Sequence, residues 1–128
     1  MTNWIQMLVT ALLVPLGMFV IGLIMAKRPP KRINHICGYR TARSMKSQAA
    51  WDFANVLSGK IWCVLGAALL IINTVPMLFV MKQSETVIFV LGTALCAFSV
   101  LVMIASPFFV EHRLAQEFDE KGTEKSKE

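Results

Sequence analysis

The sequence predicts an all-α membrane protein with three transmembrane helices and a basic cytoplasmic loop that contains a short amphipathic helix. The chain of 128 residues is 55% hydrophobic and only 16% charged, which is too apolar for an ordinary soluble domain. Its apolar residues gather in three long uncharged runs, and its basic residues gather between the first two runs. We therefore expect one membrane domain over residues 1–120 and a disordered, charged tail over residues 121–128.

Each of the three apolar runs is long enough to cross a bilayer. They cover about residues 4–26, 61–81 and 86–110, and each exceeds the roughly 20 residues that span the hydrocarbon core. Three buried helices of a soluble protein would leave too little amphipathic sequence to cover them. Because Lys27 and Arg28 follow the first run and no basic residue precedes it, we expect this run to be a membrane anchor and not a cleaved signal.

The charge of the loop between the first two runs predicts the orientation of the chain. Eight basic residues against the single acid Asp52 give residues 27–60 a net charge of +7. The positive-inside rule places such a loop in the cytoplasm. Residues 82–85 join the second and third runs in a tight hairpin on the opposite side. We therefore expect the N-terminus outside the cell and the C-terminus in the cytoplasm.

The loop itself should contain a turn and then a helix. Pro29 and Pro30 end the first helix, because neither has an N–H group to continue its hydrogen bonds. The chain then pivots at Gly38. A helix is expected to begin near Thr41 or Ser44, since either side chain can cap it.

This expected loop helix has two different faces. An apolar face suited to lipid headgroups or to packing against the spans contains Met45, Ala49, Ala50, Phe53, Val56 and Leu57. The opposite face carries Ser44, Gln48, Trp51 and Asn55. Three polar side chains around one large aromatic form a candidate recognition surface. Alternatively, Trp51 packs back onto residues 38–41 and Asn55 hydrogen-bonds the backbone there; the sequence does not separate these two arrangements.

The remaining polar residues indicate neither catalysis nor a cofactor. Cys63 and Cys96 lie in apolar runs, and His35 with Cys37 supplies at most two of the about four ligands of a zinc site. The sequence contains no paired carboxylates, nucleophile motif or glycine-rich phosphate loop. The basic residues flank membrane ends without any nucleic-acid-binding module, so anionic lipid headgroups, and not nucleic acid, are the expected partners.

Polar residues within the spans allow a structural role or a transport role. Asn73, close to Pro76, is expected to hydrogen-bond across helices or to a freed backbone carbonyl. A small transporter or channel subunit, acting as an oligomer, is the alternative function, and its polar path would have to use Asn73, Thr74, Thr93, Ser99 and Ser106.

A motif in the loop resembles the SdpI/YfhL family of bacterial membrane immunity proteins. Gly-Tyr-Arg-Thr at residues 38–41, followed by a serine, a tryptophan and Ala-Asn at fixed spacings, lies between one span and a two-span hairpin. The resemblance covers about residues 8–110. It implies immunity to a membrane-active antimicrobial peptide toxin, and signalling by binding a transcriptional repressor through the loop. It also implies recognition roles at the motif positions Gly38, Tyr39, Arg40, Thr41, Ser44, Trp51 and Asn55; Gln48 joins them from the polar face.

Overall fold

Three long helices account for most of the computed structural model, which describes residues 2–34, 38–119 and 123. The helices are α1 (Thr2–Lys27), α2 (Gln48–Phe79) and α3 (Glu85–Glu117). Each is long and apolar enough to cross a membrane, which confirms the predicted fold class. The chain is a multi-pass membrane protein. The expected disorder of residues 121–128 falls, apart from Thr123, outside the described residues.

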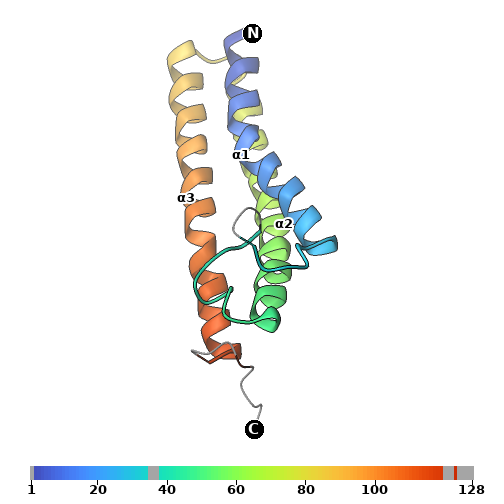
Figure 1. Cartoon of the computed structure of the whole chain (residues 1–128). Helices are drawn as coiled ribbons and strands as arrows, with labels where there is room; N and C mark the ends of the chain where they lie inside the picture. Colours follow the sequence, from blue (N-terminus) through green and yellow to red (C-terminus); the bar gives the residue numbers. More distant parts are fainter. Residues whose placement is uncertain (1, 35–37, 120–122, 124–128) are drawn as a thin grey trace.

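The helices form a bundle whose two ends differ. α1 and α3 run in the same direction and α2 runs in the opposite one (Figure 1). The start of α1 and the turn between α2 and α3 lie at one end, here called the hairpin end. The described parts of the polar loop, residues 28–34 and 38–47, and the end of α3 lie at the other, here called the loop end. Large apolar side chains such as Leu13, Val64 and Leu101 remain more than 60% exposed along the outer faces, as lipid-facing surfaces require.

α2 differs from the prediction, because the expected loop helix is its first three turns and not a separate element. The helix begins at Gln48, where the Ser47 side chain accepts a hydrogen bond from Ala50 N at 3.0 Å. Neither Thr41 nor Ser44 caps it. A helix of 32 residues is about 48 Å long at 1.5 Å per residue, so it extends well beyond a hydrocarbon core of about 30 Å.

α3 also extends past the predicted end of its span, and this extension packs against the first turns of α2. Phe118, which follows α3, meets Phe53 edge to face with ring centroids 5.5 Å apart. A buried apolar cluster at the loop end contains Tyr39, Ala50, Ala54, Val110, Leu114 and Phe118. Of the apolar face expected for the loop helix, Ala50, Phe53 and Leu57 join this cluster, whereas Ala49 is exposed and Met45 precedes the helix.

α1 and α2 touch backbone to backbone at three glycines. A Cβ atom on Gly22 would lie 2.5 Å from Cys63 N, one on Gly59 would lie 2.5 Å from Ala26 N, and one on Gly66 would lie 2.5 Å from Phe19 N. Real Cβ atoms do not approach backbone so closely, so any side chain at these positions would force the two helices apart. Small residues permit such close approach of membrane helices.

Two prolines free backbone carbonyl groups inside the bundle, and side chains bind those groups. α1 bends midway along its length (Figure 1) and contains Pro15, which leaves the carbonyl of Ala11 without its helical partner. Asn73 Nδ2 of α2 donates to this carbonyl at 2.6 Å and to Ser99 Oγ of α3 at 2.9 Å. The expectation that Asn73 hydrogen-bonds across helices is therefore confirmed.

The second case is Pro107 of α3, which frees the carbonyl of Met103. Ser106 Oγ donates to that carbonyl at 2.8 Å and accepts from Trp62 Nε1 of α2 at 2.8 Å. The Ser106 side chain thus provides the hydrogen bond that the Met103 carbonyl loses at Pro107, and it also connects α3 to α2.

Candidate functional site

The polar loop folds onto the loop-end portions of α2 and α3 (Figure 1). Four of the motif side chains, two from the loop and two from α2, are buried there. Ser44, Trp51 and Asn55 are fully buried, and Tyr39 is 9% exposed. Arg40 and Gln48 are exposed, whereas Gly38 and Thr41 are partly buried. Because the buried members carry polar atoms, each of these atoms requires a partner.

Gly38 makes the turn that brings the loop against Asn55. Its φ of +94° suits glycine, and a Cβ atom there would lie 2.5 Å from Asn55 Oδ1. The same Asn55 oxygen accepts a hydrogen bond from Tyr39 N at 2.7 Å, while Asn55 Nδ2 donates to Trp51 O at 2.9 Å. Asn55 therefore anchors the loop backbone to α2.

Trp51 joins α2 to the start of the loop. Its indole Nε1 donates to the carbonyl of Pro30 at 2.7 Å, and its ring is completely buried. A buried indole needs such a partner. Trp51 and Asn55 thus hold the loop at two points, one on each side of Gly38.

Thr41 and Ser44 form a closed turn by exchanging hydrogen bonds. Thr41 N donates to Ser44 Oγ at 2.8 Å, and Ser44 N donates to Thr41 Oγ1 at 3.1 Å. Ser44 Oγ also lies 3.1 Å from Tyr39 O and 3.0 Å from Thr41 O, and its single proton can be donated to either. Since both hydroxyl groups are occupied in this turn, they do not cap α2.

Tyr39 and Arg43 attach the loop to α3 through Glu111. The Tyr39 hydroxyl lies 2.8 Å from Glu111 Oε1 and 3.0 Å from Pro107 O. Arg43 Nε lies 3.5 Å from Glu111 Oε2. Burial of the phenol, followed by its hydrogen bond to Glu111 and the charge of that carboxylate, raises the pKa of Tyr39 above its ordinary value. The hydroxyl therefore stays protonated and able to donate at physiological pH.

The outer surface of the loop is basic. Gln48 Nε2 donates to Lys31 O at 2.6 Å and to Asp52 Oδ1 at 2.8 Å, so this exposed side chain ties the loop surface to α2. The exposed cations around it are Lys27, Arg28, Lys31, Arg32, Arg40, Lys46 and Lys60. A partner that approaches the loop meets these cations before any buried motif residue.

The polar face expected from the sequence is not an exposed stripe. Gln48 alone among its four members is exposed; Ser44, Trp51 and Asn55 are buried against the folded loop. Asn55 binds the backbone of Tyr39, as in the second arrangement considered above, and Trp51 binds Pro30. Gln48, Trp51 and Asn55 lie on α2 as expected, whereas Ser44 lies in the turn before the helix, so the expected face was wrong for that residue. The helical projection also could not show that the loop covers this face.

Sequence reasoning missed the role of Glu111. Glu111 is one of few acids near a membrane end. It lies 72 residues from Tyr39 and 68 residues from Arg43 in the sequence, so no local pattern links it to either partner. The carbonyl groups of Pro30 and Pro107 were missed for a similar reason. A proline frees the carbonyl four residues before it and not its own, so no local signal marked these two carbonyl groups as acceptors.

The residues considered for a transport path form separate contacts between helices. Asn73 and Ser99 are bonded to each other and fully buried, and Ser106 is bonded to Trp62. Thr93 is exposed on the lipid-facing surface of α3, and Thr74 is partly buried. Asn73, Ser99 and Ser106 thus join helices within one subunit.

Metal ligands do not cluster in the described part of the chain. Residues 2–34, 38–119 and 123 contain no group of three histidine, cysteine, aspartate or glutamate side chains that could hold an ion. His35 and Cys37, which the sequence offered as a weak pair of ligands, lie outside the described residues.

The part of the chain that resembles known proteins includes most of the loop and the helices that hold it. The model of the SdpI/YfhL protein family matches residues 31–106. The protein YfhL of Bacillus subtilis (strain 168), itself described as uncharacterized, is 41% identical over 49 residues, which are 38% of this chain and 44% of that protein. The match thus spans less than half of that relative. No solved structure matches the chain.

Proposed function

Because this chain belongs to the SdpI/YfhL protein family, we propose that it is a non-enzymatic bacterial cell-membrane protein that gives immunity to a membrane-active antimicrobial peptide toxin. The observation that carries this proposal is the family match over residues 31–106, which includes most of the folded loop, all of α2 and most of α3 within its range. Three membrane-crossing helices suit a protein that meets such a peptide at the bilayer.

The proposed orientation places the loop end in the cytoplasm and the hairpin end outside. The net charge of +7 between residues 27 and 60 supports this orientation. A toxin that arrives from outside would first meet the hairpin end, and a cytoplasmic partner would meet the loop.

The proposed signalling role belongs to the exposed surface of the loop. Arg40, Lys46 and Gln48 are exposed, whereas Trp51 and Asn55 are not. A transcriptional repressor that binds this surface needs acidic groups to complement the cations, and anionic lipid headgroups offer the same complement. The guanidinium of Arg40 can bind a carboxylate or a phosphate through two parallel hydrogen bonds.

The test of immunity is peptide challenge. A susceptible strain with and without the gene is exposed to a panel of membrane-active peptides, and the minimal inhibitory concentrations are compared. We expect the gene to raise that concentration for at least one peptide while leaving sensitivity to an intracellular antibiotic unchanged. Equal sensitivity of both strains to every peptide would refute the proposal.

The test of signalling is separate and uses the loop. Expressed with its gene neighbourhood, the intact chain should retain a repressor at the membrane fraction after peptide exposure, and a variant with Arg40→Glu and Lys46→Glu should not. Protection must be measured in the same cells. Retention by the charge-reversed variant would exclude the basic loop surface as the repressor's docking site.

A further inference from the structure

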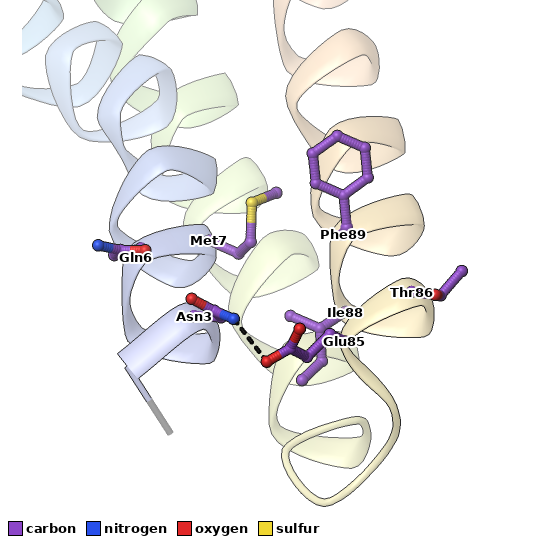
Figure 2. Close-up of a pocket in the computed structure, with 7 residues that line it drawn as sticks. All are labelled: Asn3, Gln6, Met7, Glu85, Thr86, Ile88 and Phe89. Carbon is purple, nitrogen blue, oxygen red and sulfur yellow. Dashed lines mark hydrogen bonds between the residues drawn. The ribbon is translucent and has the colours of Figure 1, made fainter.

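A pocket opens at the hairpin end between the first turns of α1 and α3. It has a volume of about 490 Å³, within the range of about 300–1,000 Å³ that is usual for ligand sites. Figure 2 shows its lining, with Asn3, Gln6 and Met7 on α1 and Glu85 and Phe89 on α3. Nothing in the loop-end site described above involves these residues.

The pocket combines a carboxylate with an aromatic ring on the same helix. Glu85 lies in the first turn of α3, and its Oε1 accepts a hydrogen bond from Asn3 Nδ2 at 2.7 Å (Figure 2). Among the described residues no cation is paired with this carboxylate. Phe89 lies one helical turn further along α3 and is 62% exposed. The pocket therefore offers a ligand a negative charge and an apolar surface one helical turn apart.

The walls of the pocket are held rigidly. Trp4 Nε1 donates to Met77 O at 2.7 Å, which fixes the first turn of α1 to the end of α2. On the side of the pocket away from the hairpin end, α1 and α3 lie close together. A Cβ atom on Gly92 would lie 3.3 Å from Met7 Cβ and would overlap the end of the Met7 side chain. Ser84 caps α3 immediately before Glu85. The pocket is thus preformed, which lowers the entropic cost of binding.

We propose that this pocket binds the cationic, apolar end of a membrane-active peptide, with a lysine, arginine or α-amino group of the peptide against Glu85 and an apolar side chain against Phe89. The inference rests on the proposed immunity function and on the proposed orientation, which together put the peptide and the pocket on the same side of the membrane. Charge complementarity selects the cationic peptide: Glu85 is the acid at the pocket mouth, and an acidic ligand would be repelled.

The experiment measures binding of a short synthetic peptide of lysine and leucine to the full chain in phosphatidylcholine nanodiscs. The zwitterionic lipid keeps the lipid background low. We expect the chain to bind the peptide more tightly than empty nanodiscs do. Glu85→Gln should weaken binding about fivefold, as expected for a partly exposed ion pair, and Phe89→Ala about tenfold. Higher salt should weaken binding to the parent and affect the Glu85→Gln variant less.

Two variants at the other end of α3 serve as matched controls. Glu117→Gln removes the same charge, and Phe108→Ala removes a similar ring that is 74% exposed; each should change affinity less than about twofold. Glu85→Gln keeps an oxygen to accept from Asn3, and Phe89 is exposed, so both pocket variants should fold, which circular dichroism and thermal melting will check. Parent binding no tighter than that of empty nanodiscs, or pocket variants that bind like the parent, would overturn the assignment.

Survival assays distinguish this inference from the immunity function on which it rests. If the parent protects cells and both pocket variants protect equally well, the pocket assignment is wrong and immunity stands. If no strain is protected although the purified protein shows the expected pattern of binding, the pocket assignment stands and the immunity function is wrong. Loss of protection in the pocket variants alone supports both.

Discussion

The contact between α1 and α2 and the attachment of α3 to that pair are built in opposite ways. α1 and α2 meet through backbone at Gly22, Gly59 and Gly66, where side chains are absent. α3 is held by polar side chains at separate levels: Asn3 with Glu85, Asn73 with Ser99, Trp62 with Ser106, and Tyr39 with Glu111. The first contact depends on close backbone packing over several turns, whereas the second combines individual hydrogen bonds with the apolar contact of Phe118 and Phe53 at the loop end. A side chain at one of the three glycines should therefore separate α1 from α2 along the whole contact. Loss of one hydrogen bond should weaken the attachment of α3 only at that level.

The largest expected effect comes from breaking the glycine contact. Gly66→Leu places a side chain where even a Cβ atom would lie 2.5 Å from Phe19 N, so α1 and α2 must separate. We expect a loss of about 3 kcal/mol or more in unfolding free energy, at or beyond the upper end for overpacked cores. Membrane abundance and thermal unfolding in detergent will measure it.

Gly17→Leu is the matched control for this change. A Cβ atom on Gly17 meets nothing within 4 Å, although the residue lies in α1 close to the same interface in sequence. It should be expressed and unfold like the parent. If both leucine variants melt together with the parent, the close approach of α1 and α2 does not determine stability.

The next effect concerns the anchor between the loop and α2. Asn55→Ala leaves the buried Tyr39 N–H without an acceptor, at a cost of about 1–3 kcal/mol. The loop should then be cleaved faster by trypsin after Arg40, Arg43 or Lys46. Gln48→Ala, which removes exposed hydrogen bonds from the same helix, should change the cleavage rate much less. Equal rates for the two variants would show that Asn55 is not the main anchor.

A smaller effect is expected where the loop meets α3. Tyr39→Phe removes the hydroxyl that lies between Glu111 and Pro107 and should lower stability by about 1 kcal/mol. Glu111→Ala removes the carboxylate that contacts both Tyr39 and Arg43. Melting temperatures of the single and double variants form a cycle that tests this site. Strictly additive losses would mean that Tyr39 and Glu111 are not energetically coupled.

The smallest expected effect on stability is that of Arg40→Lys, which tests whether Arg40 serves recognition and not folding. Arg40 is exposed, so Arg40→Lys should change unfolding free energy by no more than about 0.5 kcal/mol. It should nevertheless reduce function, because an ammonium does not reproduce the planar fork of a guanidinium. Protein abundance and peptide survival will be measured side by side. Full protection by the lysine variant would show that Arg40 contributes only its positive charge.

The sequence predicted the parts of the fold that depend on local composition. Length and apolarity sufficed for three membrane helices, because a bilayer sets both requirements directly. The continuity of α2 was missed, since polar residues such as Gln48 and Asp52 suggested a separate helix, although a helix that protrudes from the membrane tolerates them. Asn73 was predicted well because an amide inside a bilayer must find a partner.

The candidate site was less predictable because its contacts are distant in sequence. The face shared by Trp51 and Asn55 follows from helical spacing, but its coverage depends on Gly38 turning the loop back over it. Glu111 has no local signal that links it to Tyr39. The role of Gly59 and Gly66 could have been suspected, since seven residues place them on one face of α2, yet their partner helix could not be identified.

Because α2 is continuous, it connects the contacts at the two ends of the bundle. One continuous helix of about 48 Å carries Met77, whose carbonyl accepts from Trp4 at the hairpin end, and Trp51, whose indole donates to Pro30 at the loop end. A tilt of about 5° around the hairpin end displaces the loop end by about 4 Å, from the helix length alone. Because Trp51 and Asn55 attach the loop to α2 itself, the loop would move with the helix. The displacement would instead act on the contact with α3, where the Tyr39 hydroxyl lies only 2.8 Å from Glu111, so a small tilt on one side of the membrane would rearrange contacts on the other.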